Sequence, residues 1–342
     1  MTEGLDTGAL ARWIDAEQPG VLDTSGPLTA TLITGGKSNL TYRVGDGTRE
    51  IIARRPPLGH VLATAHDMSR EYRVMRALAD TAVPVPITYG LCQDDSVIGA
   101  PFYLMESVPG TPYQRVDQLE PLGPERTRAI SERLVDTLAA LHEVDYASVG
   151  LGDFGRPDGY LERQVRRWKK QLDASRSREI DGIDELYARL ERSIPQAGDG
   201  TIVHGDYRLD NALVDDADRI TAVLDWEMST LGDPLTDVAL MVAYQNLALH
   251  ETGDSPASVT DAPKAPGYLS VDAVIERYAA TSGRDLSELG FHLGLAYFKL
   301  AVILEGIHFR FLQGATVGEG FDQIGAGFDP LIAAGLQALG QE

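Results

Sequence analysis

The sequence predicts an α+β protein of two lobes, a small N-terminal lobe with an antiparallel sheet and one key helix, and a larger, mainly helical lobe. Three observations predict this division. Short runs of β-branched and aromatic residues, separated by Gly, Asp and Pro, fill residues 28–106. A Pro109-Gly110 turn then ends the strand pattern, and the segments beyond it carry apolar residues at helical spacing. We therefore expect one lobe at 1–107 and the other at 108–342.

The N-terminal lobe is predicted to begin with a helix at 11–18 and to continue as strands. The expected strands are 29–33, 40–44, 50–53, 96–98 and 101–106. Gly35-Gly36-Lys37-Ser38-Asn39 joins the first two strands. Glycines and small polar residues there allow backbone N–H groups to approach a phosphate, although Gly-Gly is also an ordinary hairpin turn.

An ion pair is predicted within this lobe. Arg54 ends the third strand, and Glu71 lies in the first turns of a helix expected at 68–79. Arginine stays charged and can contact two phosphate oxygens at once, so a paired Arg54 is suited to hold a nucleotide. The simpler interpretation is that both residues are separate surface charges.

The larger lobe is predicted from helical periodicity. The expected helices are 125–142, 160–172, 232–249, 271–280, 285–312 and 321–339, with a surface loop at 250–266. His142, at the end of the first of these helices, is expected to be structural. The second helix carries a basic cluster made of Arg163, Arg166, Arg167, Lys169 and Lys170. Such a cluster is usually a solvated face.

The most informative stretch is His204-Gly205-Asp206-Tyr207-Arg208-Leu209-Asp210-Asn211, followed by Asp225. Strands expected at 212–214 and 220–224 form a hairpin, which can hold Asp206, Asn211 and Asp225 around one small volume. Phosphoryl transfer needs a carboxylate that orients and deprotonates a hydroxyl, and oxygen ligands for magnesium. The order His-x-Asp-x4-Asn, then Asp, is typical of kinase catalytic loops. The alternative is an acidic loop that closes a hairpin.

The segment after this hairpin, Gly232-Asp233-Pro234-Leu235-Thr236-Asp237, predicts a helix start. Asp233 fits the N-cap position and Pro234 the first helical position, which explains both without a function. Asp237 lies one turn inside the helix. We expect its carboxylate to bond to the backbone of the 204–211 loop.

Composition limits the functions that the chain can have. The 342 residues are 43% hydrophobic, enough for a sizeable core, and the formal net charge of −21 argues against nucleic-acid binding. The single cysteine, Cys92, excludes an internal disulfide and fits a reducing compartment. Residues 1–6 lack a signal-peptide pattern. The apolar stretch 291–312 is interrupted by Lys299, Glu305 and Arg310, so we expect a cytoplasmic protein without membrane contact.

Together the motifs resemble the aminoglycoside phosphotransferase and choline-kinase-like branch of the protein-kinase-like fold. The matching segments are 35–42, 70–78, 204–211, 224–227 and 232–239. Ser-Asn-Leu-Thr-Tyr at 38–42, Arg-Arg-Pro-Pro-Leu-Gly at 54–59 and Asp-Trp-Glu at 225–227 look most like a subgroup fused to, or encoded beside, acyl-CoA dehydrogenases. That subgroup is associated with phosphorylation of hydroxyacyl-CoA thioesters.

The resemblance implies a role for each matching residue. Asp206 looks like the catalytic base, while Asn211 and Asp225 look like magnesium ligands that Glu227 supports. The implied nucleotide-binding residues are Ser38 and Asn39 at the phosphates, Arg54 with Glu71, and Glu106 and Val108 in the adenine-facing hinge at 105–108. Arg54 departs from the protein-kinase pattern, which has lysine here, but the subgroup also carries arginine.

The predicted function is an ATP- and Mg²⁺-dependent small-molecule kinase that transfers the γ-phosphate to a hydroxyl. The resemblance favours a hydroxyacyl-CoA-type acceptor, with an acyl-CoA dehydrogenase as a partner in the same pathway and helix 163–170 as a seat for the CoA phosphates. An aminoglycoside or another amino alcohol is the alternative acceptor, because most of the acidic excess lies beyond residue 107. A pseudokinase that binds nucleotide without turnover is the alternative of another class; the intact Asp206, Asn211 and Asp225 argue against it.

Overall fold

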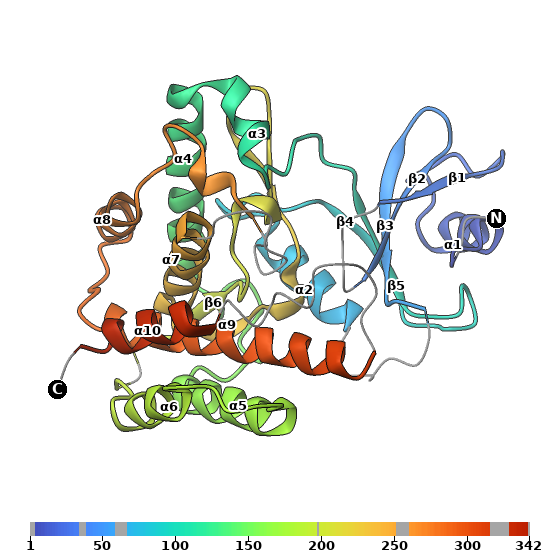
Figure 1. The fold of residues 1–342 in the computed structure, drawn as a ribbon. Coiled ribbons are helices and arrows are strands. Elements are labelled where there is room, and N and C mark those ends of the chain that lie inside the picture. Colours follow the sequence, from blue (N-terminus) through green and yellow to red (C-terminus); the bar gives the residue numbers. More distant parts are fainter. Residues whose placement is uncertain are drawn as a thin grey trace. The chain divides into compact units, whose positions relative to one another are not determined.

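The computed structural model describes residues 4–33, 39–58, 67–196, 198–250, 260–314 and 328–340. The chain divides into two compact units, both drawn in Figure 1. Unit 1 contains Met1–Thr111 and Thr221–Ser229, and unit 2 contains Pro112–Ile220 and Thr230–Glu342. The second segment of unit 1 carries Asp225, which the sequence analysis placed with the larger lobe.

Unit 1 is built on a five-stranded antiparallel sheet (Figure 1). Its strands are β1 (Thr29–Leu32), β2 (Leu40–Gly45), β3 (Glu50–Arg55), β4 (Thr88–Cys92) and β5 (Phe102–Glu106). The strand order is β1-β2-β3-β5-β4, so β3 and β5 lie inside the sheet. Arg54 and Glu106 therefore stand near the ends of two neighbouring central strands.

The strand predicted at 96–98 is wrong. Asp94 organises a turn there, because its carboxylate accepts a hydrogen bond from the Ser96 amide (2.9 Å) and its carbonyl accepts one from the Val97 amide (3.3 Å). Turn chemistry outweighs the strand preference of these residues. The edge strand is instead β4, whose pairing with β5 is irregular between Thr88 and Gly90.

Two helices complete unit 1. Helix α1 (Thr7–Glu17) begins earlier than predicted, because the Asp6 carboxylate caps it by accepting from the amides of Gly8 and Ala9. Leu10 and Ile14 of α1 are fully buried in the core that includes Phe102 of β5. Helix α2 (Met68–Leu78) has the predicted position. A short 3-10 helix, η3 (Trp226–Met228), also belongs to this unit.

Unit 2 is mainly helical, as predicted. Its helices are α3 (Val116–Leu119), α4 (Pro124–Glu143), α5 (Tyr160–Ser175), α6 (Ile183–Arg192), α7 (Leu235–His250), α8 (Val271–Ser282), α9 (Leu289–Leu312) and α10 (Phe328–Ala338), with 3-10 turns η1 (Glu120–Leu122), η2 (Leu209–Asn211) and η4 (Ala262–Lys264). The sequence analysis missed α3 and α6. Residues 321–327, predicted to begin the last helix, lie outside the described residues.

Short strands frame the predicted catalytic loop. β6 (Thr201–Val203) leads into it and pairs antiparallel with β9 (Thr230–Gly232), while β7 (Ala212–Val214) follows it. The other strand of the predicted hairpin, β8 (Ile220–Val223), also forms. The chain passes from unit 2 to unit 1 within β8.

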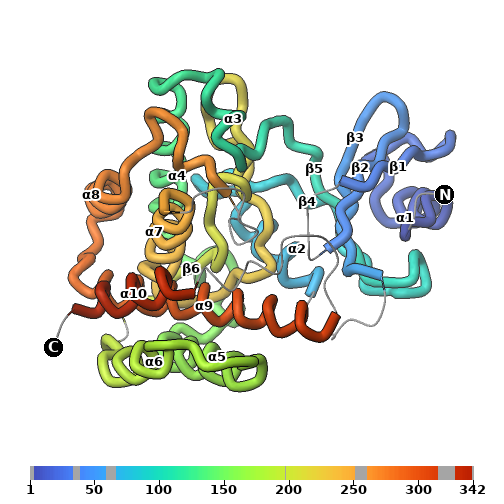
Figure 2. The backbone as a smooth tube through the Cα atoms, in the orientation of Figure 1, coloured from blue at the N-terminus to red at the C-terminus, as the bar shows by residue number. Residues whose placement is uncertain are grey.

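Helix α9 is the core helix of unit 2. It contacts α5, α6, α7 and α10, and Figure 2 shows it running beside α10. By length and composition alone it could cross a membrane, but 67% of its apolar window is buried inside the protein. This agrees with the prediction of a core helix rather than a membrane span. It begins at Leu289, after a turn in which the Asp285 carboxylate accepts from the Ser287 amide (2.9 Å).

Candidate active site

The loop that carries Asp206 is fixed from behind by Asp237 of α7. The Asp237 carboxylate is fully buried and accepts hydrogen bonds from the amides of His204 (2.6 Å) and Gly205 (2.8 Å). The predicted bond from Asp237 to the loop backbone is therefore confirmed. Burial alone would raise the pKa of Asp237, but the bonds from His142 and the His204 amide, with the charge of these histidines, lower it.

His142 supports this anchor from α4. Its Nε2 lies 3.3 Å from Asp237 Oδ2, and its Nδ1 lies 2.7 Å from the Tyr278 hydroxyl. All three side chains are buried. The side-chain partners of His142 in the described part of the chain are thus Tyr278 and the loop anchor Asp237, which agrees with the structural role expected from the sequence.

Asp206 lies between two side chains of its own loop. The Arg208 guanidinium is 3.2 Å from Asp206 Oδ2, and the Asn211 amide nitrogen donates to the Asp206 carbonyl (2.8 Å) and to Oδ2 (3.3 Å). Both of these hydrogen bonds use the Asn211 nitrogen, so within the described residues its amide oxygen is available as a metal ligand. Asp206 itself keeps 24% of its side chain exposed, so its carboxylate is accessible from solvent.

Two residues next to Asp206 were given no role from the sequence. Arg208 also lies 3.3 Å from Asp210 Oδ2 and stacks over the Tyr244 ring at 4.8 Å. Burial, the Asp206 charge and a hydrogen bond to Asp206 together raise the pKa of Tyr244. Tyr244 comes from α7, so only the packing of α7 on the loop brings it to the site.

A third unassigned residue, Lys299, reaches the loop from α9. Its ammonium donates to the Gly205 carbonyl at 3.0 Å and lies 5.6 Å from the centre of the Trp168 ring of α5. In the sequence, Lys299 is visible as a charge that interrupts an otherwise apolar stretch. The sequence analysis took this charge only as evidence against a membrane span.

Unit 1 holds a second group of predicted residues around Arg54. The Arg54 Nε lies 3.2 Å from Glu71 Oε2, and the same guanidinium bonds to the Asp225 carboxylate. The predicted Arg54–Glu71 pair is therefore confirmed. The side chains of Arg54 and Glu71 are 12% and 1% exposed, which excludes the interpretation as separate surface charges.

Glu71 is held by further contacts inside unit 1. The Tyr103 hydroxyl donates to Glu71 Oε2 (2.9 Å), and the Asn39 amide donates to Glu71 Oε1 (3.0 Å) and to Glu227 Oε2 (3.2 Å). Asn39 thus links two carboxylates by its amide nitrogen. Its predicted contact with nucleotide phosphates stays a prediction, and Ser38 lies outside the described residues.

Among the described residues of this cluster, carboxylates outnumber cations. Glu71 and Asp225 contact the Arg54 guanidinium, and the charge of Glu227 acts on Glu71. Burial raises the pKa of Glu71 to about 7, even though Arg54 and Tyr103 oppose the shift. The pKa of Arg54 is raised despite its burial, by Tyr103, Glu71 and Asp225. A divalent cation bound at Asp225 would supply the missing positive charge.

Asp225 has an unusual backbone. Its φ of 65° lies in the left-handed region, which among the described non-glycine residues is shared only with Asp218. Aspartate tolerates this conformation better than most residues, and such geometry is frequent where a side chain is aimed at a ligand. Asp225 lies two residues after the end of β8 and immediately before η3.

The predicted hinge residues lie at the end of strand β5 and just beyond it. Glu106 is its last residue, and its amide donates to the Ile87 carbonyl at 2.8 Å. Glu106 and Val108 are half-buried. Their contact with adenine stays a prediction. The joint site of Asp206, Asn211 and Asp225 also stays a prediction, because Asp225 belongs to unit 1 and the other two belong to unit 2.

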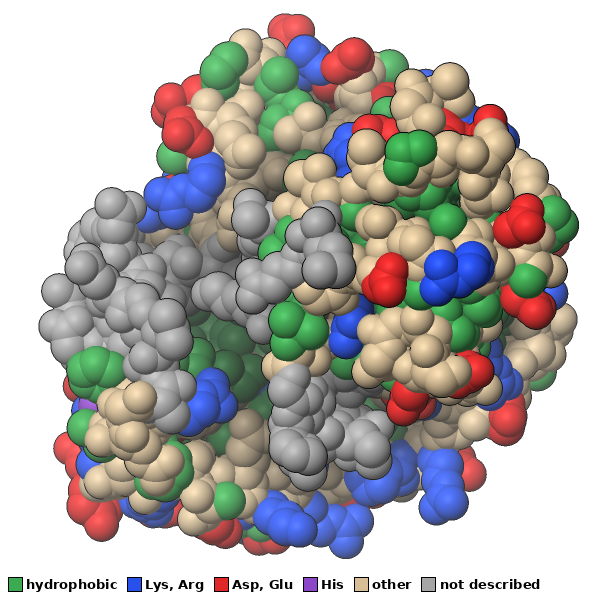
Figure 3. Space-filling view, turned by 90° about the vertical axis from the view of Figure 1, so that its right-hand side faces the viewer, with side chains coloured by type: hydrophobic (Ala, Val, Ile, Leu, Met, Phe, Trp, Pro, Cys, Tyr) green, Lys and Arg blue, Asp and Glu red, His purple; other side chains and the backbone are tan. Residues whose placement is uncertain are grey.

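The basic cluster of α5 is partly used inside the protein. Arg163 donates to the carbonyls of Arg156 and Asp158, and Lys169 pairs with Asp173. Arg166, Arg167 and Lys170 are exposed. Figure 3 shows Lys and Arg side chains gathered along the lower edge of its face, at the height of α5 in Figure 1.

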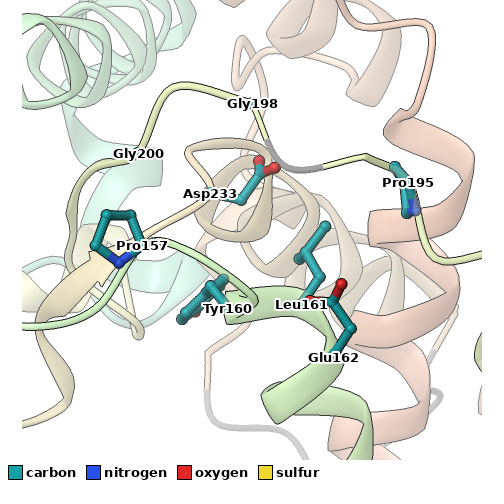
Figure 4. A pocket seen from close by; sticks show the side chains of 9 residues that line it. Pro157, Tyr160, Leu161, Glu162, Pro195, Gly198, Gly200 and Asp233 are labelled. Atoms are coloured by element: carbon teal, nitrogen blue, oxygen red, sulfur yellow. The ribbon is translucent and has the colours of Figure 1, made fainter.

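A pocket elsewhere in unit 2 contains none of the predicted site residues. Figure 4 shows it beside the start of α5, with Tyr160, Leu161 and Glu162 on the helix and Asp233 opposite. Asp233 Oδ1 lies 3.1 Å from His292 Nε2 and accepts a hydrogen bond from the Leu235 amide (2.9 Å). The second bond is the helix cap that the sequence predicts.

No group of three or more His, Cys, Asp or Glu side chains among the described residues is arranged to hold a metal ion. Magnesium prefers six oxygens and often takes only one or two from the protein, with phosphate and water completing the shell. Asn211, whose amide oxygen is available, and Asp225, in an acidic cluster, have the chemistry for such a site.

A family model identifies the chain. Residues 29–272 match the model of the phosphotransferase enzyme family (APH), which is more than half of the sequence. The chain belongs to this family and has a protein-kinase-like fold. It is a phosphotransferase with an alcohol group as acceptor, as the motifs predict.

The curated relatives that match this chain are named as acyl-CoA dehydrogenase family members. The chain is 37% identical over 303 residues to "Acyl-CoA dehydrogenase family member 10" of Mus musculus, covering 86% of this chain and 28% of that protein. It is 34% identical over 337 residues to "Acyl-CoA dehydrogenase family member 11" of Gallus gallus, covering 97% and 43%. The chain thus spans less than half the length of these relatives.

Solved structures agree on the fold. A crystal structure from Ralstonia eutropha, titled as a candidate aminoglycoside phosphotransferase, is 34% identical, with a TM-score of 0.83 and 98% of each chain covered. Aminoglycoside phosphotransferase APH(4)-Ia, solved as a ternary complex with AMP-PNP and hygromycin B, is 13% identical, with a TM-score of 0.58 over 96% of this chain and 98% of that one. The second likeness shows the fold alone.

Proposed function

We propose that the chain is an ATP- and Mg²⁺-dependent kinase that transfers the γ-phosphate to the hydroxyl of a hydroxyacyl-CoA-type acceptor. The observation that carries the kinase proposal is the setting of Asp206. Its carboxylate is partly exposed, lies between Arg208 and Asn211, and stands on a loop whose backbone Asp237 fixes. A rigid, accessible carboxylate is what deprotonation of an alcohol requires.

Asp206 would accept the proton of the acceptor hydroxyl as its oxygen attacks phosphorus. Asn211 would offer its amide oxygen and Asp225 its carboxylate to magnesium, which neutralises charge on the phosphates of bound ATP. Arg54 bonds to Asp225 and so holds that carboxylate in place, while Glu71, which accepts a hydrogen bond from Tyr103, pairs with Arg54. Ser38, Asn39, Glu106 and Val108 complete the proposed nucleotide site.

Two observations support an acyl-CoA acceptor. The relatives that match almost the whole chain are named for acyl-CoA dehydrogenases, so a phosphotransferase and a dehydrogenase would act on one acyl pathway. The exposed Arg166, Arg167 and Lys170 of α5 offer cations for the CoA phosphates. We place this reaction in the cytoplasm, in keeping with the single cysteine.

An aminoglycoside acceptor is the second candidate, supported by the name of the Ralstonia eutropha protein whose structure is 34% identical. Aminoglycosides are polycations, and a polycation would meet Arg208 and Lys299 beside Asp206. Like charges at close range oppose binding. Asp206 and Asp210 add negative charge at the same place, so the preference for the acyl acceptor rests on the relatives' names and on the cations of α5.

Asp206→Asn tests the kinase mechanism. We expect kcat to fall by about 10²–10⁴-fold, because general-base assistance contributes that much, while ATP affinity stays near wild type. Calorimetry measures ATP binding, and mass spectrometry measures phosphorylated product across hydroxyacyl-CoAs, aminoglycosides and amino alcohols. Full activity in Asp206→Asn would remove Asp206 from the mechanism. A wild-type protein that binds ATP but phosphorylates none of these acceptors would favour a pseudokinase.

A further inference from the structure

Lys299 is a half-buried cation in an otherwise apolar part of a core helix. It belongs to α9, the core helix of unit 2, and its neighbours Phe298, Leu300 and Ala301 are buried. Burial lowers the pKa of Lys299, against the opposing charges of Asp206 and Asp237. A cation that is partly withdrawn from water loses hydration, which its contacts must replace.

The contacts inside the protein use only part of the ammonium. An ammonium has three N–H donors, and one of them bonds to the Gly205 carbonyl. The Trp168 ring lies 5.6 Å away and offers a cation–π contact rather than a hydrogen-bond acceptor. Within the described residues no further acceptor is bonded to Lys299, which leaves two donors for a bound molecule.

Holding the loop does not require this charge. The amides of His204 and Gly205 are already fixed by Asp237, and a neutral donor would satisfy the Gly205 carbonyl equally well. Gly205 immediately precedes Asp206, so the Lys299 ammonium lies beside the proposed base. The Arg208 guanidinium lies 3.2 Å from Asp206 Oδ2. The positive charge of Arg167 also acts on Lys299.

We propose that Lys299 binds the acceptor, donating a hydrogen bond to a carbonyl or carboxylate oxygen that the acceptor carries near its reactive hydroxyl. This inference rests on the proposed function, in which that hydroxyl lies at Asp206. An ammonium favours an oxygen acceptor and repels a cation, so Lys299 selects hydroxy acids and their thioesters over plain alcohols and amino alcohols. Arg208 adds to the same selection.

Three acceptors of equal chain length separate the contributions. They are a short hydroxyalkanoate anion, its N-acetylcysteamine thioester, and the matching alkanol in which a methylene replaces the carbonyl carbon. The thioester has a carbonyl but no CoA phosphates, so its binding does not depend on α5. The anion and the thioester distinguish a carboxylate from a carbonyl as the preferred oxygen.

The variants are Lys299→Met, which keeps the length of the side chain and removes the charge, and Lys299→Arg, which keeps the charge. Lys264→Met is the matched control, because Lys264 is an exposed lysine of the same unit. For the anion and the thioester we expect Lys299→Met to raise the acceptor KM by about 10- to 100-fold, the effect of one charged hydrogen bond. The alkanol KM and the ATP affinity should change less than about 3-fold, while Lys299→Arg should retain the preference for oxygen-bearing acceptors.

A fall in kcat for all three acceptors at unchanged KM would overturn the proposal, because it would mean that Lys299 only positions Gly205. Equal effects in Lys264→Met would overturn it as well. Calorimetric binding of the hydroxyalkanoate to the wild type and to Lys299→Met decides the matter without turnover. Weaker binding in the variant supports the subsite even if no acceptor is phosphorylated, and equal binding refutes it even if the kinase mechanism holds.

Discussion

Asp237→Asn removes one negative charge from the side chain that holds the Asp206 loop. In the wild type, the two oxygens of Asp237 accept from the amides of His204 and Gly205, and Oδ2 also lies 3.3 Å from His142 Nε2. Asparagine keeps one oxygen and puts an NH₂ group where the other was. One of the two loop amides must then face a donor in a fully buried position.

The expected loss of stability follows from these contacts. A hydrogen bond to a charged group contributes about 1.5–3 kcal/mol, and a buried donor without an acceptor costs about 1–3 kcal/mol. We therefore expect the free energy of unfolding to fall by about 2–4 kcal/mol. Because the Gly205–Asp206 backbone loses its support, we also expect a lower kcat and faster hydrogen exchange at the amides of His204 and Gly205.

Asp145→Asn is the matched control for this change. Asp145 also accepts from two backbone amides, those of Ala147 (3.0 Å) and Ser148 (3.3 Å), but in an exposed turn. Asparagine fills such turns about as well as aspartate, so a loss below about 0.5 kcal/mol is expected. Urea denaturation and amide exchange measured by mass spectrometry compare the two variants. Equal losses in both, or wild-type exchange in Asp237→Asn, would refute the reasoning.

The pH dependence gives an independent check on Asp237. Its pKa is lowered in the folded protein from 3.8, so its contribution to stability is present above pH 3.8 and is lost as the pH falls toward the folded pKa. Asparagine does not titrate. The gap in unfolding free energy between the wild type and Asp237→Asn should be constant at neutral pH and should narrow in acid below 3.8. A gap that widens in acid would contradict the lowered pKa.

Two further predictions concern the cluster in unit 1. Asp225→Asn should abolish turnover without unfolding the protein, because it removes the charged magnesium ligand; an unchanged rate at saturating magnesium would exclude this role. Glu71→Ala should raise the ATP KM or lower kcat, since Arg54 loses a buried partner at 3.2 Å. The control is Glu50→Ala, which breaks an exposed pair with Arg43 worth only about 0–1 kcal/mol and should leave the kinetics unchanged. Equal kinetics in the two glutamate variants would argue against a nucleotide role for Glu71.

Much of the candidate site could be predicted because its parts are local in the sequence. Asp206 and Asn211 stand on one short loop, and the residue order itself indicates phosphoryl-transfer chemistry. Asp233 and Pro234 indicate where α7 begins, so the sequence predicts that Asp237 lies near the start of this helix. The Arg54–Glu71 pair was also predictable, since it joins the end of one strand to the first turns of the next helix.

Other contacts depended on packing between segments that are distant in the sequence. Tyr103 meets Glu71 because β5 lies next to β3 in the sheet, and the strand order is not encoded in either strand alone. The edge strand β4 was missed for a related reason. Its pattern is weak, and only pairing with β5 makes it a strand.

Composition, motif order and helical periodicity thus determined the fold class and the family, and they predict the reacting residues, because these properties follow from short segments of the chain. Tertiary structure alone decided what surrounds the reacting residues. Tyr244 and Lys299 reach the Asp206 loop only because α7 and α9 pack on it, and 221–229 joins unit 1 although it lies far along the chain. The physical reason is that burial and charge at a site are set by every element packed around it, and local sequence does not specify those neighbours.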